Sequence, residues 1–282
     1  MILDALLDAL LDAVLDTLRT LPFLFAAFMV IEAMEHYSNQ YSSRALARVG
    51  KAGPFWGAVL GCIPQCGFSV AAANLYSGGL VTLGTLLAVF LSTSDEAVLI
   101  LLAHPGSGRV IGSLLIWKVV IGMGAGCLMD LLFRKKKEEK HIEEMCRNCG
   151  CSDTSGVLRP ALLHTVRLGA YLFVFTFCLN LILELIGMEQ LSRILGKDTL
   201  FQPFLAALLG LIPNCASSVL ITELYLSGGL SFASAIAGLS AGAGVGTAVL
   251  FRSNHPMREN VRILALLYGS AVVSGLLLGW LL

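Results

Sequence analysis

The amino-acid sequence predicts an all-α polytopic membrane protein of two inverted repeats, each with about five transmembrane segments and with broken or re-entrant helices. Its 282 residues are 56% hydrophobic and only 13% charged, whereas a soluble domain has about 25% charged residues. Several apolar stretches reach the roughly 20 residues that a helix needs to cross a bilayer. An internal repeat, in which proline interrupts an apolar segment twice, points to a transport site.

The repeat is anchored on Gly61-Cys62-Ile63-Pro64-Gln65-Cys66, which returns as Gly210-Leu211-Ile212-Pro213-Asn214-Cys215. After one inserted residue, Ser77-Gly78-Gly79-Leu80 aligns with Ser227-Gly228-Gly229-Leu230. Proline removes a backbone donor and clashes with the preceding turn. Irregular backbone in lipid is tolerated only where protein buries it or where it lines a cavity. We therefore expect a helix break or hinge in each half, formed by Gly61, Pro64, Gly210 and Pro213.

The chain divides into four parts. Residues 1–16 carry an aspartate at every fourth position, which predicts an amphipathic acidic helix in the membrane interface. Residues 17–133 form the first transmembrane repeat, 134–160 a Cys/His linker and 161–282 the second repeat. The apolar segments within the repeats are 18–37, 54–76, 80–103, 109–133, 162–187, 203–225, 230–251 and 261–282.

The segment 80–103 is interrupted by Ser92-Thr93-Ser94-Asp95-Glu96, which predicts two short helices that meet at a polar point. Ionisable groups at membrane depth usually mark an ion path, so Ser94, Asp95 and Glu96 are candidate substrate ligands. The matching stretch 240–246 is glycine-rich and uncharged. We therefore expect one half to supply acids and the other flexible backbone. Lys118 is either an internal counter-ion for these acids or a side chain that snorkels to the interface.

Lysine and arginine in short loops predict the orientation. The loops 38–53 and 252–262 and the linker 134–160 are basic and are expected in the cytoplasm. Each half then crosses the membrane an odd number of times, either in five crossings or in three full spans with a re-entrant hairpin. Both termini would lie outside a bacterial-type plasma membrane.

Three cysteines lie at the breaks: Cys66 and Cys215 at equivalent positions, and Cys62 in the first half alone. In an inverted repeat, the two equivalent thiols would approach one another near the midplane. Thiolates bind soft or borderline metals and metalloids, although a buried cysteine otherwise behaves as a small hydrophobe. Other polar side chains suit either substrate binding or helix–helix hydrogen bonding, namely Gln65, Asn214, Ser69, Ser218, Asn74 and Glu223.

The linker carries His141, Cys146, Cys149 and Cys151. Three thiols and an imidazole can complete a tetrahedral site for zinc or another thiophilic ion. Such a site would be a structural clip or a cytoplasmic metal sensor; a disordered linker with incidental thiols is the alternative. The sequence indicates no other cofactor.

The repeated Ile-Pro-x-Cys, the Ser92–Glu96 segment and the Cys-rich linker together resemble a family of ten-span heavy-metal exporters. Its members are often labelled manganese transporters, and it is related to the arsenical permeases. The resemblance covers roughly 17–282 and implies efflux of a metal or metalloid. Membrane thiols of the arsenical permeases are taken to bind trivalent arsenic, which carries over to Cys62, Cys66 and Cys215. Manganese would instead favour Asp95, Glu96 and Glu223, because it prefers oxygen ligands.

These features predict a secondary transporter that exports a heavy-metal ion or metalloid through a midplane site at the repeat interface. The alternatives are a permease for a small organic solute and a metal-sensing membrane receptor. An intramembrane enzyme is disfavoured, because no catalytic constellation is recognisable. No Walker A motif supports ATP as the energy source. The expected partners are the metal substrate and the lipid bilayer, without nucleic acid, and a homo-oligomer is compatible.

Overall fold

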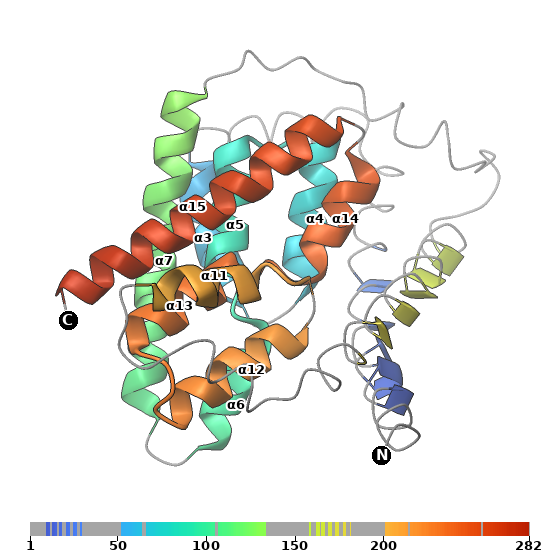
Figure 1. The fold of residues 1–282 in the computed structure, drawn as a ribbon. Coiled ribbons are helices and arrows are strands. Elements are labelled where there is room, and N and C mark those ends of the chain that lie inside the picture. The colour runs from blue at the N-terminus through green and yellow to red at the C-terminus, as the bar shows by residue number, and fades with distance from the viewer. Residues whose placement is uncertain are drawn as a thin grey trace.

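A computed structural model describes the chain at 52–63, 66–104, 107–133, 201–213, 215–254 and 256–281, and at parts of 10–29 and 158–181. The described residues form helices and connecting turns, without a strand, which confirms the predicted all-α class. Helical residues within 10–29 and within 158–181 lie side by side: a Cβ on Gly169 would stand 3.0 Å from Leu21 Cδ2 (Figure 1).

The two halves contain the same helices in the same order. The first half has α3 (Gly53–Gly61), α4 (Cys66–Ser77), α5 (Leu83–Ser92), α6 (Asp95–Ala103) and α7 (Gly108–Leu132). The second half has α11 (Gln202–Gly210), α12 (Cys215–Leu226), α13 (Phe232–Ala241), α14 (Val245–Ser253) and α15 (Met257–Leu281). Corresponding helices have equal lengths of 9, 12, 10, 9 and 25 residues.

The structure corrects the predicted position of the inserted residue. Gly79 and Gly228 both adopt positive φ, 73° and 75°, in the turn after α4 and α12, so these two glycines are the equivalent pair. The N-caps of α5 and α13 keep the same spacing. The side chains of Thr82 and Ser231 each accept a hydrogen bond from the backbone N–H three residues later, that of Thr85 or Ser234. No residue is therefore inserted before the Ser-Gly-Gly turn. The extra residue lies in the second break, where three residues separate α13 from α14.

The proline segment of the first half forms a hairpin. Helix α3 runs beside α5 in the same direction: its first residue, Gly53, contacts Thr85, and its last, Gly61, contacts Val89 and Ser92. Only residues 78–82 separate the end of α4 from the start of α5. Helix α4 therefore returns to the end of the molecule at which α3 begins. This arrangement favours three full spans with a hairpin over five crossings.

Two pairs of helices pack across the boundary between the halves. Helix α4 packs most extensively against α14 of the second half, and α12 packs against α6 of the first half. Figure 1 shows the pair α4 and α14 at the upper right and the pair α6 and α12 at the bottom. The remaining helices pack within their own halves as α3–α5–α7 and α11–α13–α15.

The long helices α7 and α15 traverse the molecule. Phe133, just after α7, lies 4.3 Å below the guanidinium of Arg262, near the start of α15. The other end of α15 reaches the starts of α11 and α13, since a Cβ on Gly275 would stand 3.1 Å from the Ala233 carbonyl and 3.2 Å from Pro203 Cβ. Helix α7 therefore ends where α15 begins.

Four stretches of the described residues are long and apolar enough to cross a membrane: Leu83–Ala103, α7, Phe232–Ser253 and α15. In the most apolar part of the two broken stretches, 75% and 89% of residues are buried, against 22% and 39% in α7 and α15. The broken helices thus form the interior, and the unbroken helices face outward.

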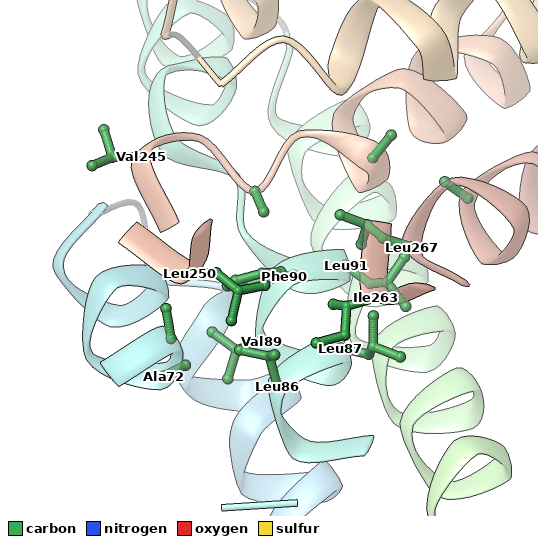
Figure 2. Packing of buried hydrophobic residues seen from close by; sticks show 14 of the residues in the cluster. Ala72, Leu86, Leu87, Val89, Phe90, Leu91, Val245, Leu250, Ile263 and Leu267 are labelled. Carbon is green, nitrogen blue, oxygen red and sulfur yellow. The ribbon is translucent and has the colours of Figure 1, made fainter. Parts of the chain in front are cut away.

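The interior is closed by apolar side chains around α5. Figure 2 shows Phe90 beside Leu250 of α14, and Leu91 near Ile263 and Leu267 of α15. All five side chains are at most 2% exposed. This apolar cluster thus joins both halves directly beside the breaks.

Candidate functional site

The two broken helices, α5 with α6 and α13 with α14, are each interrupted in the interior of the molecule. Helix α5 ends at Ser92, and Thr93 then turns to φ −58°, ψ 130°, an extended conformation that stops the helix. Helix α13 ends at Ala241, and α14 starts after Gly244, whose φ of 50° and ψ of −136° suit glycine. The same interruption is therefore made with hydroxyl residues in one half and with glycine in the other.

The hydroxyl residues of the first break are buried and turn back on their own backbone. Ser92 Oγ donates to Ala88 O at 2.8 Å, and Thr93 Oγ1 donates to Val89 O at 2.7 Å. Ser94 Oγ donates to Ser92 O at 3.3 Å. Asp95 and Glu96 open α6, but their side chains lie outside the described residues.

Lys118 joins the two breaks. It lies inside α7, is 0% exposed, and donates through Nζ to the Thr93 carbonyl and to the Leu239 carbonyl, the latter at 2.7 Å. Of the two alternatives, snorkelling to the interface is wrong, because the lysine is fully enclosed. The counter-ion alternative stays a prediction, because the side chains of Asp95 and Glu96 lie outside the described residues. A cation beside the carbonyl ends of α5 and α13 is also favoured by both helix dipoles.

One predicted thiol lies close to this lysine. Cys62 follows α3, is partly buried, and its Sγ donates to the Leu115 carbonyl at 3.8 Å. Leu115 precedes Lys118 by three residues on α7, or about one helical turn. Cys66 and Cys215 are the first residues of α4 and α12, and their side chains lie outside the described residues.

The helices before both proline segments end at glycine. Gly61 is the last residue of α3 and packs against Ser92 and the Val89 carbonyl of α5. Gly210 ends α11 and packs against the Gly238 carbonyl of α13. A side chain would separate these helices, so glycine lets the hairpins touch the broken helices. Pro213 lies just after α11 and is partly buried, while Pro64, Gln65 and Asn214 fall outside the described residues.

The remaining predicted ligands are spread along the helices, and of these Ser69 packs beside the second break. Asn74 Oδ1 accepts from Ser253 Oγ at 2.9 Å, near the ends of α4 and α14. Its counterpart Glu223 is exposed on α12. Ser69 is buried against Gly246 of α14, where a Cβ on the glycine would stand 2.7 Å from Ser69 Cβ. Ser218 is partly buried, and its carbonyl accepts from Thr222 Oγ1 at 2.7 Å.

Two polar anchors were missed by the sequence reasoning. Asp130 of α7 accepts from Gly84 N at 2.9 Å and from Thr82 Oγ1 at 2.7 Å, which fixes the start of α5. Gln202 of α11 accepts from Ser231 N at 3.2 Å and from Ser234 Oγ at 2.9 Å, which fixes the start of α13. Polar residues near the ends of apolar helices were the available signal. They hold the broken helices in place from the ends opposite to the breaks.

The linker cluster His141, Cys146, Cys149 and Cys151 lies outside the described residues. Among the residues that the structure describes, no group of three or more His, Cys, Asp or Glu side chains is placed to hold a metal ion. Within the same part of the chain, Cys62, Cys127 and Cys178 are free thiols.

A scan of protein families finds one family model that matches residues 2–167 and 162–281, with the description "Putative, 10TM heavy-metal exporter". The chain belongs to this family. No curated protein and no solved structure matches it.

Membership in this exporter family agrees with the apolar helices that the structure contains. The protein is an integral membrane protein, and its family is one of heavy-metal transport. The two matched regions together span both halves of the chain, in accord with the resemblance read from the repeated motif.

Proposed function

We propose that the protein is a secondary transporter that exports a heavy-metal cation through a site between its two broken helices. The observation that carries this proposal is the meeting of both breaks at Lys118, which bonds to a carbonyl of each half. Broken helices at the repeat interface are where many secondary transporters bind their substrates. The transport step involves no covalent chemistry.

The proposed halves are inverted relative to one another. Helix α7 ends beside the start of α15, and α15 ends beside the starts of α11 and α13. Helix α5, in contrast, starts beside the end of α7, where Asp130 caps it. The equivalent helices α5 and α13 therefore start from opposite ends, as an axis in the membrane plane requires.

This arrangement also supports the proposed orientation. Three basic segments adjoin the same end of the molecule: the loop before α3, the linker after α7 and the turn between α14 and α15. Lysine and arginine concentrate on the cytoplasmic side. We assign this end to the cytoplasm, so the hairpin of α3 and α4 enters from the cytoplasm and the hairpin of α11 and α12 from outside.

The proposed ligands are of two kinds. Cys62 is partly buried, contacts Leu115 one turn before Lys118, and is a soft ligand. Cys66 and Cys215 open the return helices of the two hairpins and would add two more thiols. Asp95 and Glu96, in the first turn of α6, would add carboxylates for harder cations.

The test is elemental analysis of inside-out vesicles after exposure to manganese, zinc, cadmium, arsenite and methylarsenite, with and without the protein. We expect ATP-independent accumulation of at least one divalent cation. The double variant Cys66→Ser with Cys215→Ser should abolish accumulation of a thiophilic cation. Cys127→Ser is the matched control, because Cys127 is an exposed thiol on α7.

Each result decides something different. Loss of cadmium or zinc accumulation in the double variant, with Cys127→Ser unaffected, supports the thiol ligands. Full accumulation in the double variant would refute the thiols and leave the carboxylates. No accumulation of any metal by well-folded protein would refute export itself.

A further inference from the structure

The Lys118 ammonium occupies a position that is built for a cation. Helix α13 stops before Ala243, whose amide donates to the Ala241 carbonyl at 3.1 Å instead of reaching back to Leu239. The Leu239 carbonyl thereby loses its helical partner, and Lys118 Nζ takes its place. Thr93 has also left the helical conformation, and its carbonyl receives the same ammonium. Both oxygens are available because the helices are broken there.

Further backbone oxygens lie around Gly242, three residues after Leu239. A Cβ built on Gly242 would stand 3.3 Å from the Gly210 carbonyl, 3.6 Å from the Leu239 carbonyl and 3.7 Å from the Gly238 carbonyl. Gly242 is partly exposed although the rest of this break is buried. Next to Leu239, Ser240 has a fully buried hydroxyl with no hydrogen-bond partner among the described residues. The missing side chain of Gly242 thus lets three backbone carbonyls approach one another closely.

We propose that these carbonyls form a cation site, and that Lys118 is a tethered cation that fills it until the transported metal cation displaces it. The inference rests on the proposed function and gives a structural reason why the substrate is a cation and not an uncharged metalloid. An ammonium and a metal cation a few ångströms apart repel strongly at low dielectric. The two therefore occupy the site in turn, and Lys118 must leave its carbonyls when the metal arrives.

Displacement of Lys118 has a mechanical consequence. Its two carbonyl partners belong to different halves of the protein, so the ammonium ties the first break to the second. When the metal cation takes these oxygens, it replaces the ammonium between the two breaks, and their link to α7 through the Lys118 side chain is released. The broken helices are then free to move relative to α7. When the metal leaves, the ammonium returns and resets the site. Lys118 acts here as a positioning residue, not as a substrate ligand.

The test compares metal binding with transport in the full-length protein. Cadmium and arsenite binding are measured by equilibrium dialysis with elemental analysis; the first is a cation and the second is uncharged at neutral pH. Lys118→Gln removes the charge but keeps hydrogen-bonding capacity. We expect this variant to bind cadmium at least about tenfold more tightly than the wild type, with arsenite binding unchanged. Net cadmium export should fall at least about tenfold, while cadmium–cadmium exchange across the membrane persists.

Two further variants guard against trivial explanations. Arg109→Gln removes an exposed positive charge from the same helix, and cadmium binding should not change. Gly242→Ala places a methyl group beside the carbonyls without a severe clash and should weaken cadmium binding at least about tenfold. Gly269→Ala, which has open space around its Cβ, is the control for helix substitution.

The outcomes separate this inference from the proposed function. If Lys118→Gln lowers or leaves unchanged the cadmium affinity, or if Gly242→Ala binds cadmium normally, the cation site is refuted even though export stands. If cadmium binding shows the expected charge dependence but wild-type vesicles accumulate no metal, export is refuted and the site stands. Equal loss of binding and exchange in Lys118→Gln would assign the lysine a purely structural role.

Discussion

The two breaks interrupt equivalent helices but differ in chemistry. The first break carries Thr93 and Ser94 between its half-helices, and the second carries Gly242, Ala243 and Gly244. On the long helix behind the first break stands Lys118, while the equivalent position behind the second is Leu267, also fully buried. The charge thus comes from the first half, and backbone freedom comes from the second half.

This contrast shows that a repeat conserves architecture more readily than chemistry. Helix lengths, turn glycines and N-caps are shared by the two halves. Even the anchors of the broken helices differ, since Asp130 comes from α7 and Gln202 from α11. One buried cation suffices for both breaks, because it reaches a carbonyl of each.

The largest expected effect concerns the glycines at the hairpin ends. Gly210→Ala would drive a methyl group into the Gly238 backbone, whereas a Cβ on Gly61 would meet the Ser92 hydroxyl, which can rotate, and the Val89 carbonyl at 2.6 Å. Overpacking of this kind is expected to cost about 3 kcal/mol at Gly210 and about 2 kcal/mol at Gly61. Thermal unfolding in detergent measures both. Gly269→Ala is the control, and equal losses at Gly61 and Gly210 would contradict the difference.

The next effect concerns the lysine and its leucine counterpart. Lys118→Met should destabilise the protein by about 2 kcal/mol, because two buried carbonyls lose their donor. Leu267→Met should cost less than about 1.5 kcal/mol, since it exchanges apolar groups of similar volume. Denaturant titration of the two variants side by side checks the contrast. A Lys118→Met variant as stable as Leu267→Met would show that the carbonyls find other partners.

A smaller effect separates the backbones of the breaks. Gly244→Ala places a side chain at positive φ and should cost about 1.5 kcal/mol. Ser94→Ala removes only a long hydrogen bond to Ser92 and should cost less than about 1 kcal/mol. Melting temperatures of the purified variants give the order. The contrast fails if Ser94→Ala is the more damaging of the two.

The smallest effect tests the equivalent tyrosines. Tyr76 Oη donates to Glu259 Oε1 at 2.7 Å, which ties α4 to α15. The equivalent Tyr225 instead packs its ring 5.9 Å from Phe232. Tyr76→Phe should therefore cost about 1 kcal/mol, whereas Tyr225→Phe should be nearly neutral. Chemical denaturation of both variants measures the difference, and a neutral Tyr76→Phe would mean that this contact contributes nothing.

Much of the fold could be predicted because it depends on local patterns. The apolar segments, the turn glycines and the interruption at Ser92–Glu96 are visible in the sequence and recur as helix ends in the structure. The predicted position of the inserted residue was wrong, because it was chosen from the repeated Ser-Gly-Gly sequence and not from the backbone conformation of the turn. Structurally, the turn is defined by positive φ at Gly79 and Gly228, and not by the serine.

The site was harder to predict because it depends on which helices meet. Nothing local in the sequence indicates that Lys118 lies beside Leu239, since 121 positions separate them. The exchange of α4 with α12 between the halves is likewise a long-range fact. For Asn74 and Glu223 the sequence left substrate binding and helix–helix hydrogen bonding open. Asn74 bonds to Ser253 between α4 and α14, which is the second of these roles, and Glu223 is exposed.

The pairing of helices between the halves also determines how long α4 lacks its packing partner during synthesis. Helix α4 ends at Ser77, but its main packing partner α14 starts only at Val245. A chain made from its N-terminus, at about 5–20 residues per second, therefore exposes the partner face of α4 for many seconds before that face is covered. The first half therefore stays incomplete in the bilayer until α14 has been made. A ribosome that stalls within the second half leaves a product in which this face of α4 stays uncovered.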